Sequence, residues 1–407
     1  MKLPRTHLLV LISMCCLVAV NIGLLSNVQG LFLGPIAEEL GVLKGAVSLT
    51  ITISSICGGL GGMLVPKLIG RKHLRPVVIA LAAIGGLATA GFSLCHSMAS
   101  IYALCVVRGL ASGALGMVFA TSILNNWFHA NIGLFTSIAV GCSGLAGSVF
   151  SLVFSDVIEL FGWRVGYVVM ALCSVVLIMP TILFVPSAKP EDVRLVPFGE
   201  TSMRVPSSVG AGKGGASAAP VAPVVFAMIV AYAVLAHGPA SVNQHIPGLG
   251  TSYGFDAAIG ATMLSAAMVV NTVGKVAFGA LSDRIGAKRT ILLYAAVVCC
   301  ALGGLLILRG KGALIGSAAV FGLTFSLNTV GVTIATRELC GQENYGKVYP
   351  VATLAGSASY ASLSSVYGYL YDFTGGYGVS LVIALVMTVL AAGSMVVAYG
   401  QVEKQKA

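Results

Sequence analysis

The chain has 407 residues, of which 57% are hydrophobic and only 9% charged, and its mean hydropathy is +0.97. Soluble domains carry about a quarter charged residues, so this composition excludes an ordinary soluble protein and favours one that lies in a lipid bilayer. The net charge of +10 does not indicate nucleic-acid binding, because the basic residues form neither one arm nor one face. We therefore expect the bilayer as a partner, and no nucleic acid.

Apolar stretches recur along the whole chain, and about twelve of them reach the roughly 20 residues that a membrane-spanning helix needs. The first stretch follows two basic residues, but it stays apolar too long for a signal peptide and has no small-residue cleavage site, so we interpret it as a retained span. The sequence thus predicts an all-α membrane protein. The expected spans are 8–34, 45–66, 74–95, 99–125, 131–158, 165–185, 223–246, 257–281, 290–308, 313–336, 348–371 and 376–399.

Enzyme and metal signatures are missing from the sequence. The ten cysteines are scattered, mostly inside apolar runs, without the paired spacing of a metal site. There is no H-E-x-x-H motif, no G-x-S-x-G motif and no pair of carboxylates at one depth of the membrane. We therefore expect no catalytic residue, no metal and no cofactor, and we predict that the protein is not an enzyme.

Positive charge is unevenly distributed between the predicted loops. If the N-terminus lies inside, only Lys44, Arg164, Arg309 and Lys311 of the 23 lysines and arginines fall on the outer side. Two more lie within spans, and the remaining 17 fall on the inner side. This bias predicts that both termini are cytoplasmic, in a protein of the cell membrane.

A polar segment rich in Pro, Gly, Ser and Ala separates the sixth and seventh spans. It has too few periodic apolar residues to pack into a core, so it is interpreted as a cytoplasmic loop. The predicted domains are therefore an N-terminal six-helix bundle at 1–185, a linker at 186–221 and a C-terminal six-helix bundle at 222–407. A six-plus-six duplication is typical of transporters whose substrate site lies between two bundles.

A charged turn follows the eighth span. The glycine that begins it is expected to permit close helix approach, the aspartate to accept hydrogen bonds at a tight turn, and the basic residues to stay in the cytoplasm. The motif residues are Gly279, Asp283, Arg284, Gly286, Lys288 and Arg289. A looser copy, "GGMLVPKLIGRKHLR", follows the second span.

The stretch "GALSDRIGAKR" and the twelve-span plan with a long central loop resemble the major facilitator superfamily over the whole chain. The resemblance implies two pseudo-symmetric six-helix bundles and a monomer. The first-half copy of the motif departs from the family pattern, because Pro66 stands where the family usually has its aspartate.

A narrower resemblance connects the chain with the oxalate:formate antiporter and monocarboxylate transporter branch. It is carried by "NNWFHANIGLFTSIAVGCSGLAGSVF" with "GWRVGY", and by "NYGKVYPVATLAGSASYASLSSVYGYLYDFTG". Glycine-rich helices can match by composition alone, so these stretches are less specific than the loop motif.

Lys275 lies inside the eighth span, where an ammonium group costs about 2.5–3.5 kcal/mol on insertion scales. In the branch just named, a cation four positions before the motif glycine binds the substrate carboxylate, so the resemblance implies that Lys275 is the anion-binding residue. The family residue is typically arginine, and lysine offers a point charge in place of a planar fork. Ala352 stands where the antiporter that handles a dicarboxylate has a lysine in its eleventh span, so the resemblance favours a monocarboxylate. The alternative is that Lys275 snorkels or makes a helix contact.

Three more polar residues are candidates for substrate contact, each with a structural alternative. Asn271 lies one turn before Lys275 and either orients the substrate or hydrogen-bonds Lys275. Arg108 resembles a fourth-span arginine that is common across the superfamily, which implies a gating or structural role as readily as substrate contact. His237 could exchange protons near neutral pH, or it could simply join helices.

Gln29 and Asn328, with Asn27, Asn243 and Gln244, place amides on the first, seventh and tenth spans, which face the central cavity in this superfamily. Helix stitching is the alternative for each of them. We therefore predict a secondary transporter of a small organic anion, working by exchange or with protons or a counter-anion. The alternatives are an exporter of drug-like or other metabolites and a transport-dead membrane sensor.

Overall fold

The computed structural model describes residues 3–69, 74–130, 132–199 and 221–406. In this part of the chain 88% of the residues are helical and there is no β-strand. An isolated bridge pairs Phe128 with Phe198. The predicted all-α membrane fold is therefore confirmed.

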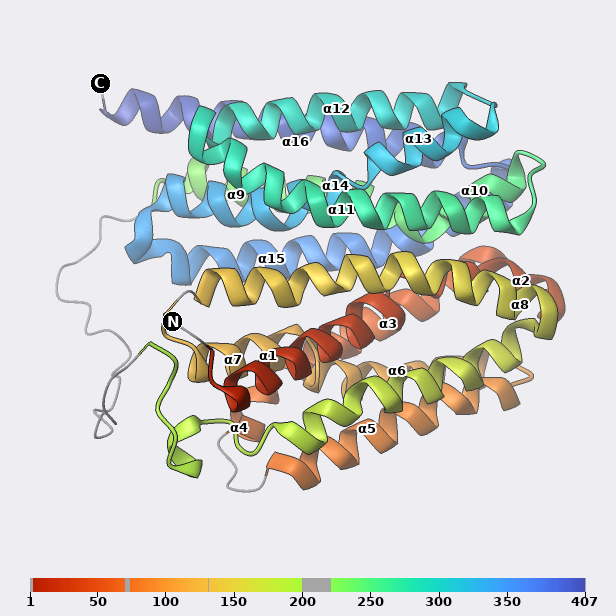
Figure 1. Ribbon diagram of the computed structural model, residues 1–407. Helices are drawn as coiled ribbons and strands as arrows, with labels where there is room; N and C mark the ends of the chain where they lie inside the picture. The colour runs from red at the N-terminus through yellow and green to blue at the C-terminus, as the bar shows by residue number, and fades with distance from the viewer. Residues whose placement is uncertain (1–2, 70–73, 131, 200–220, 407) are drawn as a thin grey trace. The chain divides into compact units, whose positions relative to one another are not determined.

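Most helices follow one another with short connections, whereas residues 185–222 separate α8 from α9 (Figure 1). Their bounds are α1 Arg5–Val18, α2 Leu33–Leu40, α3 Lys44–Gly62, α4 Val65–Ile69, α5 Leu74–Gly91, α6 Met98–Ala114, α7 Met117–Trp127, α8 Ile132–Phe184, α9 Pro223–Ala240, α10 Ile246–Ser252, α11 Ala257–Ile285, α12 Ala287–Ile307, α13 Lys311–Phe321, α14 Thr324–Ser326, α15 Val332–Thr374 and α16 Gly378–Lys406. Short 3₁₀ segments lie at Gln29–Phe32, Phe92–Leu94, Pro190–Val193 and Ser241–His245, and π-helical segments at Ala19–Leu24 and Leu327–Gly331.

Ten helical segments of the described chain are long and apolar enough to cross a membrane. One of them, Leu134–Phe184, covers most of two predicted spans, 131–158 and 165–185, because Gly162 interrupts the helix with φ 79° and ψ 164°. A similar break at Gly341 separates the tenth predicted span from 348–371, which lies in the rest of α15. Only glycine adopts such positive φ angles without strain.

Three predicted spans are irregular near polar residues. The first changes from α1 to π-helix and then to 3₁₀-helix, and the seventh is broken into α9 and α10 by the 3₁₀ segment Ser241–His245. The tenth contains the π-helical segment Leu327–Gly331. Irregular helices inside a membrane are tolerated where neighbouring protein or a cavity meets the freed backbone groups, and they frequently mark binding sites.

The contacts divide the chain into two compact units, and each is described separately. Unit 1 comprises Met1–Ser26, Ile53–Gly147 and Phe161–Ser217, and unit 2 comprises Asn27–Thr52, Ser148–Leu160 and Ala218–Ala407. The predicted division into six-helix bundles at 1–185 and 222–407 describes how the chain crosses the membrane and not which residues pack together. This division stays a prediction.

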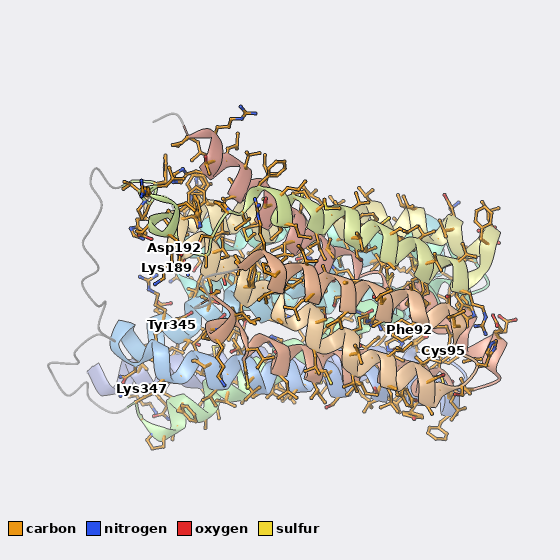
Figure 2. The ribbon with its side chains drawn as sticks, turned by 90° about the horizontal axis from the view of Figure 1, so that it is seen from below. Phe92, Cys95, Lys189, Asp192, Tyr345 and Lys347 are labelled. Carbon is orange, nitrogen blue, oxygen red and sulfur yellow. The ribbon has the colours of Figure 1, made fainter. Side chains whose placement is uncertain are left out.

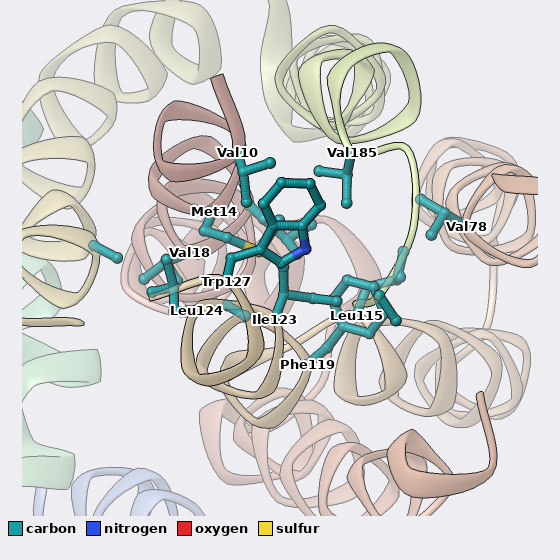
Figure 3. Close-up of a cluster of buried hydrophobic side chains, with 14 of the residues drawn as sticks. Val10, Met14, Val18, Val78, Leu115, Phe119, Ile123, Leu124, Trp127 and Val185 are labelled. Atoms are coloured by element: carbon teal, nitrogen blue, oxygen red, sulfur yellow. The ribbon is translucent and has the colours of Figure 1, made fainter. Parts of the chain in front are cut away.

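Unit 1 has an apolar core around Trp127, which is fully buried (Figure 3). Val10 and Met14 of α1 pack there with Ile123 of α7 and Val185. At one end of the unit lie Phe92 and Cys95, and at the other Lys189 and Asp192 (Figure 2).

The first part of the predicted linker belongs to this core, so the expectation of an unpacked segment is wrong for 186–199. Ala188 is buried in the core, and Phe198 packs against it. The indole of Trp127 donates a hydrogen bond to the Ser187 carbonyl. The few apolar residues of 186–199 are enough to pack this segment, because they cover the aromatic surface around Trp127. Residues 200–220 of the linker, and the first-half basic residues at 71–73, lie outside the described residues.

In unit 2, α9 packs against both α15 and α16 (Figure 1). The N-terminus of α3 is joined to the end of α15, where the Asp372 carboxylate accepts hydrogen bonds from the backbone N–H groups of Lys44 at 3.1 Å and Gly45 at 2.7 Å. Segments 27–52 and 148–160 both lie in the same unit as the second half of the chain.

Candidate functional site

Lys275 lies on α11 of unit 2 and is half-buried. Its Nζ stands 6.0 Å from the centroid of the Phe325 ring of α14. Within the described residues, this ammonium has no carboxylate and no hydrogen-bond acceptor. A cation–π contact at that distance offsets only part of the cost of burying a charge.

Gly274 brings the tenth predicted span close to this lysine. A Cβ added at Gly274 would lie 2.5 Å from Leu323 Cδ2 and 3.1 Å from Ser326 Oγ, so the glycine leaves room for these two side chains against α11. The carbonyl of Gly274 accepts a hydrogen bond from the Tyr294 hydroxyl. The helix carrying Lys275 is thereby fixed against its neighbours on two sides.

Three buried polar groups lie on the two predicted spans that meet at Gly274, namely on α11, on α14 and on the π-helical segment Leu327–Gly331. Asn271 Oδ1 and Ser326 Oγ have no hydrogen-bond partner in the described chain, and the same is true of Asn328 Oδ1. Unpaired buried polar atoms each cost about 1–3 kcal/mol, so such a set is favourable only when something else satisfies it. Of these three atoms only the Ser326 hydroxyl can donate to a carboxylate that Lys275 attracts, because the two amide oxygens are acceptors.

Asn271 does not hydrogen-bond Lys275, which was one of its two expected roles. Its amide Nδ2 lies 3.9 Å from Met268 Sδ, and no hydrogen bond to Lys275 is present. Ser326 was not singled out from the sequence. Its only signal is a hydroxyl within an apolar run next to Phe325, and its importance depends on the helix approach at Gly274.

His237 is held by the helix it belongs to. Its Nδ1 lies 2.8 Å from the Ala233 carbonyl oxygen one turn earlier, which requires Nδ1–H to donate. The ring also lies so close to Gly356 of α15 that an added Cβ there would collide with it. These contacts support the helix-joining alternative.

Gln29 also joins helices, because its Nε2 donates to Thr50 Oγ1 of α3 at 3.4 Å. Both residues are buried and both belong to unit 2. The helix-stitching alternative for Gln29 therefore has a definite partner.

Arg108 belongs to unit 1, where it is only 3% exposed. Its guanidinium donates to Ser54 Oγ at 3.1 Å and lies 4.9 Å from the centroid of the Phe92 ring. Its Nη1 has no partner among the described residues. These contacts join α6 to α3 and to the Phe92 ring within unit 1, which supports a structural role.

The charged turn after α11 differs in two respects from what the motif predicted. Asp283 and Arg284 lie in the last helical turn and are exposed, and in the described chain no hydrogen bond to Asp283 is present, because the turn itself starts only at Gly286. An added Cβ at Gly279 has no described heavy atom within 4 Å, so the close approach expected there is not observed.

Gly286 and the basic residues of the turn have the conformation and the exposure that are usual for glycine and for charged side chains. Gly286 adopts φ 85°, where glycine is favoured, and it connects α11 to α12. Lys288 forms an ion pair with Glu403 of α16 at 3.1 Å. Arg289 is exposed.

A family comparison decides what these helices belong to. The model of the Major Facilitator Superfamily matches residues 14–364, which is most of the chain. The protein is a member of the Major Facilitator Superfamily. As a member, it is a multi-pass membrane transporter, and the family points away from an enzyme.

Solved transporters of the superfamily share the fold at low sequence identity. A bacterial homologue of the human lysosomal transporter Spinster, inward-facing and unoccupied, has a TM-score of 0.69 and 12% identity, with 99% of each chain covered. The same homologue in its occupied form has a TM-score of 0.68 and 13% identity over 98% of this chain and 97% of the other. A D-xylose–proton symporter has a TM-score of 0.68 and 15% identity over 96% of each chain. No curated protein matches the chain significantly.

Proposed function

We propose that this member of the superfamily is a secondary transporter of a small organic anion, most simply a monocarboxylate, which works by alternating access as a monomer of the cell membrane. The observation that supports the proposal best is the uncompensated ammonium of Lys275. It is held on a packed helix, beside an aromatic ring and near the buried Ser326 hydroxyl, which has no hydrogen-bond partner among the described residues. An intramembrane charge without a protein counter-ion is by default a ligand site.

The charge inventory favours one carboxylate over two. Lys275 is the only lysine or arginine predicted within the spans of the second half, and Ala352 is a buried apolar residue of α15. A single ammonium can neutralise one carboxylate, and a second buried carboxylate would remain unpaired at a high desolvation cost. Either exchange or proton coupling is compatible with this arrangement.

Thermal unfolding of the purified protein tests the anion site. Formate, acetate, L-lactate, pyruvate, oxalate and succinate are compared on the wild type, Lys275→Ala, Lys275→Arg and the exposed-lysine control Lys311→Ala. A ligand at 100 times its Kd stabilises by about 2.7 kcal/mol, so we expect a monocarboxylate to raise the wild-type Tm by several degrees. Lys275→Ala should lose this shift, Lys275→Arg should keep part of it, and Lys311→Ala should keep all of it.

Counterflow in proteoliposomes tests transport itself. Vesicles loaded with the stabilising monocarboxylate should take up the labelled compound at equal pH on both sides, and Lys275→Ala vesicles should not. Equal carboxylate responses of wild type and Lys275→Ala would contradict the anion site and favour an exporter of other compounds. A Lys275-dependent Tm shift without counterflow would favour a transport-dead sensor.

A further inference from the structure

Unit 2 contains a second group of buried polar residues, at the break between α9 and α10. Six side-chain atoms there have no hydrogen-bond partner in the described part of the chain. They belong to Asn243 (both amide atoms), His245, Ser364, Tyr367 and Ser380. The set mixes donors with acceptors, and leaving each atom unpaired costs about 1–3 kcal/mol. A titratable imidazole within such a group deserves a functional explanation.

The hydrogen bonds determine the tautomer of His245. Its Nε2 lies 2.8 Å from the carbonyl oxygen of Ser364 on α15, and because a carbonyl only accepts, Nε2 carries the hydrogen. Nδ1 then presents a lone pair that accepts no hydrogen bond within the described chain. The residue is only 2% exposed. The ring is thus oriented to accept a second proton at Nδ1.

A cavity of about 610 Å³ lies next to this histidine, on the predicted outer side. Its lining includes Glu38, Glu159 and Asp372, and also Tyr377. The Tyr377 ring centroid lies 5.4 Å from that of His245. Tyr377 therefore contacts both the cavity and the imidazole, and three carboxylates near the cavity can collect protons from solution.

Other charged and titratable groups also face His245. Lys44 of α3 acts electrostatically on the ring, and Tyr367 of α15 packs edge-on at 6.3 Å. The Tyr377 ring in turn packs on the Tyr371 ring at 4.5 Å between centroids, and Asp372 lines the same cavity. Of these groups, the imidazole is the one whose ordinary titration range includes neutral pH.

We propose that His245 is the proton-binding residue that couples transport to a proton gradient, with protons entering from the cavity past Tyr377. This proposal rests on the proposed function, because a proton is useful here only if it accompanies an anion. Nδ1 accepts H⁺ and becomes imidazolium on one side, and releases the same proton on the other. One proton with one monocarboxylate makes the transport cycle electroneutral. His237 is the other candidate for this role, and His245 is favoured over it by its contact with Tyr377, which lines the cavity.

The alternative is a purely structural role, in which His245 joins α15 to the segment Ser241–His245 and binds no proton. His245→Gln separates the two roles, because a glutamine amide can still donate to the Ser364 carbonyl but does not titrate. His7→Gln is a matched control in unit 1. His7 is also buried, its Nε2 lies 3.1 Å from the Val196 carbonyl oxygen, and its Nδ1 has no partner in the described chain, but its ring packs among aromatic residues.

The first experiment measures protonation without any substrate. The six histidines of the protein are labelled with ¹⁵N, and the protein is placed in lipid bilayers. Solid-state NMR spectra are recorded from about pH 8 to about pH 5, the range in which imidazole ordinarily titrates. The signal absent from His245→Gln should show protonated Nε2 and bare Nδ1 at high pH, and imidazolium at low pH. A His245 signal that stays neutral throughout would overturn the proposal.

The second experiment measures coupling with labelled L-lactate in proteoliposomes. With an alkaline interior the wild type and His7→Gln should accumulate the label, whereas His245→Gln should lose accumulation but keep counterflow at equal pH. Accumulation by His245→Gln at the wild-type level would overturn the coupling role. If the wild type shows no counterflow, the proposed function fails instead, and the NMR titration alone decides whether His245 binds a proton.

Discussion

Glycines of α6 determine how closely α3 approaches it in unit 1. A Cβ added at Gly113 would overlap the backbone of Gly58, and one at Gly109 would lie 2.7 Å from Cys57 Cβ and 2.8 Å from the Ser54 carbonyl oxygen. Close backbone contact replaces side-chain packing at this crossing, as is usual for small residues between membrane helices. It also brings Ser54 to Arg108.

We expect Gly113→Ala to destabilise the protein by about 1–3 kcal/mol, because one methyl group forces the two helices apart. The measurement is the thermal unfolding midpoint of the purified protein in detergent. Gly59→Ala is the matched control, since its added Cβ has no described heavy atom within 4 Å. A helical Gly→Ala change in open space stabilises by about 1 kcal/mol, so the two variants should differ in sign. Equal shifts would contradict the close crossing.

Arg108 and Lys275 carry the same charge but differ in how it is compensated. Arg108 donates to a serine and lies over an aromatic ring, whereas Lys275 has only a ring at 6.0 Å among the described residues. Because a buried charge is stable only when it is paired or solvated, Lys275 retains the greater capacity to bind an anion.

Among the helices, α3 has an unusual N-terminal cap. The carboxylate that accepts its first backbone N–H groups comes from Asp372, far away in sequence on α15. The capping aspartate also interacts favourably with the positive end of the helix dipole. A local turn residue normally does this, so here the cap joins two distant segments of unit 2.

Replacing Asp372 with alanine should cost about 0.5–2 kcal/mol, as for other lost N-caps. Unfolding of the purified variant reports the change. Asp256→Ala provides the comparison, because Asp256 precedes α11 but its side chain makes no capping hydrogen bond. If Asp256→Ala destabilised as much as Asp372→Ala, the long-range cap would not be the cause.

For the whole molecule, the uneven loop charge predicts that both termini face the cytoplasm. A fluorescent protein fused to the C-terminus should therefore fluoresce in cells, whereas alkaline phosphatase fused there should be inactive. Fusions truncated after Lys311, in a predicted outer loop, should give the opposite pair of results. Fluorescence from the truncated fusion but not from the full-length one would reverse the predicted orientation.

Much of the architecture was determined by the sequence alone. Long apolar runs separated by charged turns can satisfy their backbone hydrogen bonds in a membrane only as helices, so both the all-α fold and the helix positions were predictable. Lys275 was also predictable as a candidate, because a charge inside an apolar run is costly wherever the helix packs. Gly279 shows the limit, since its motif position did not reveal that no described atom approaches it.

Only the tertiary structure decided which distant groups meet. The cap of α3 by Asp372, the approach of Ser326 to Gly274 and the contact of Tyr377 with His245 join residues far apart in the chain. The core position of 186–199 likewise depends on the aromatic surface around Trp127. The physical reason is that helix periodicity shows which face of a helix is apolar or polar but not which helix will lie against it. Packing between segments decides whether a buried polar atom has a partner or remains free for a ligand.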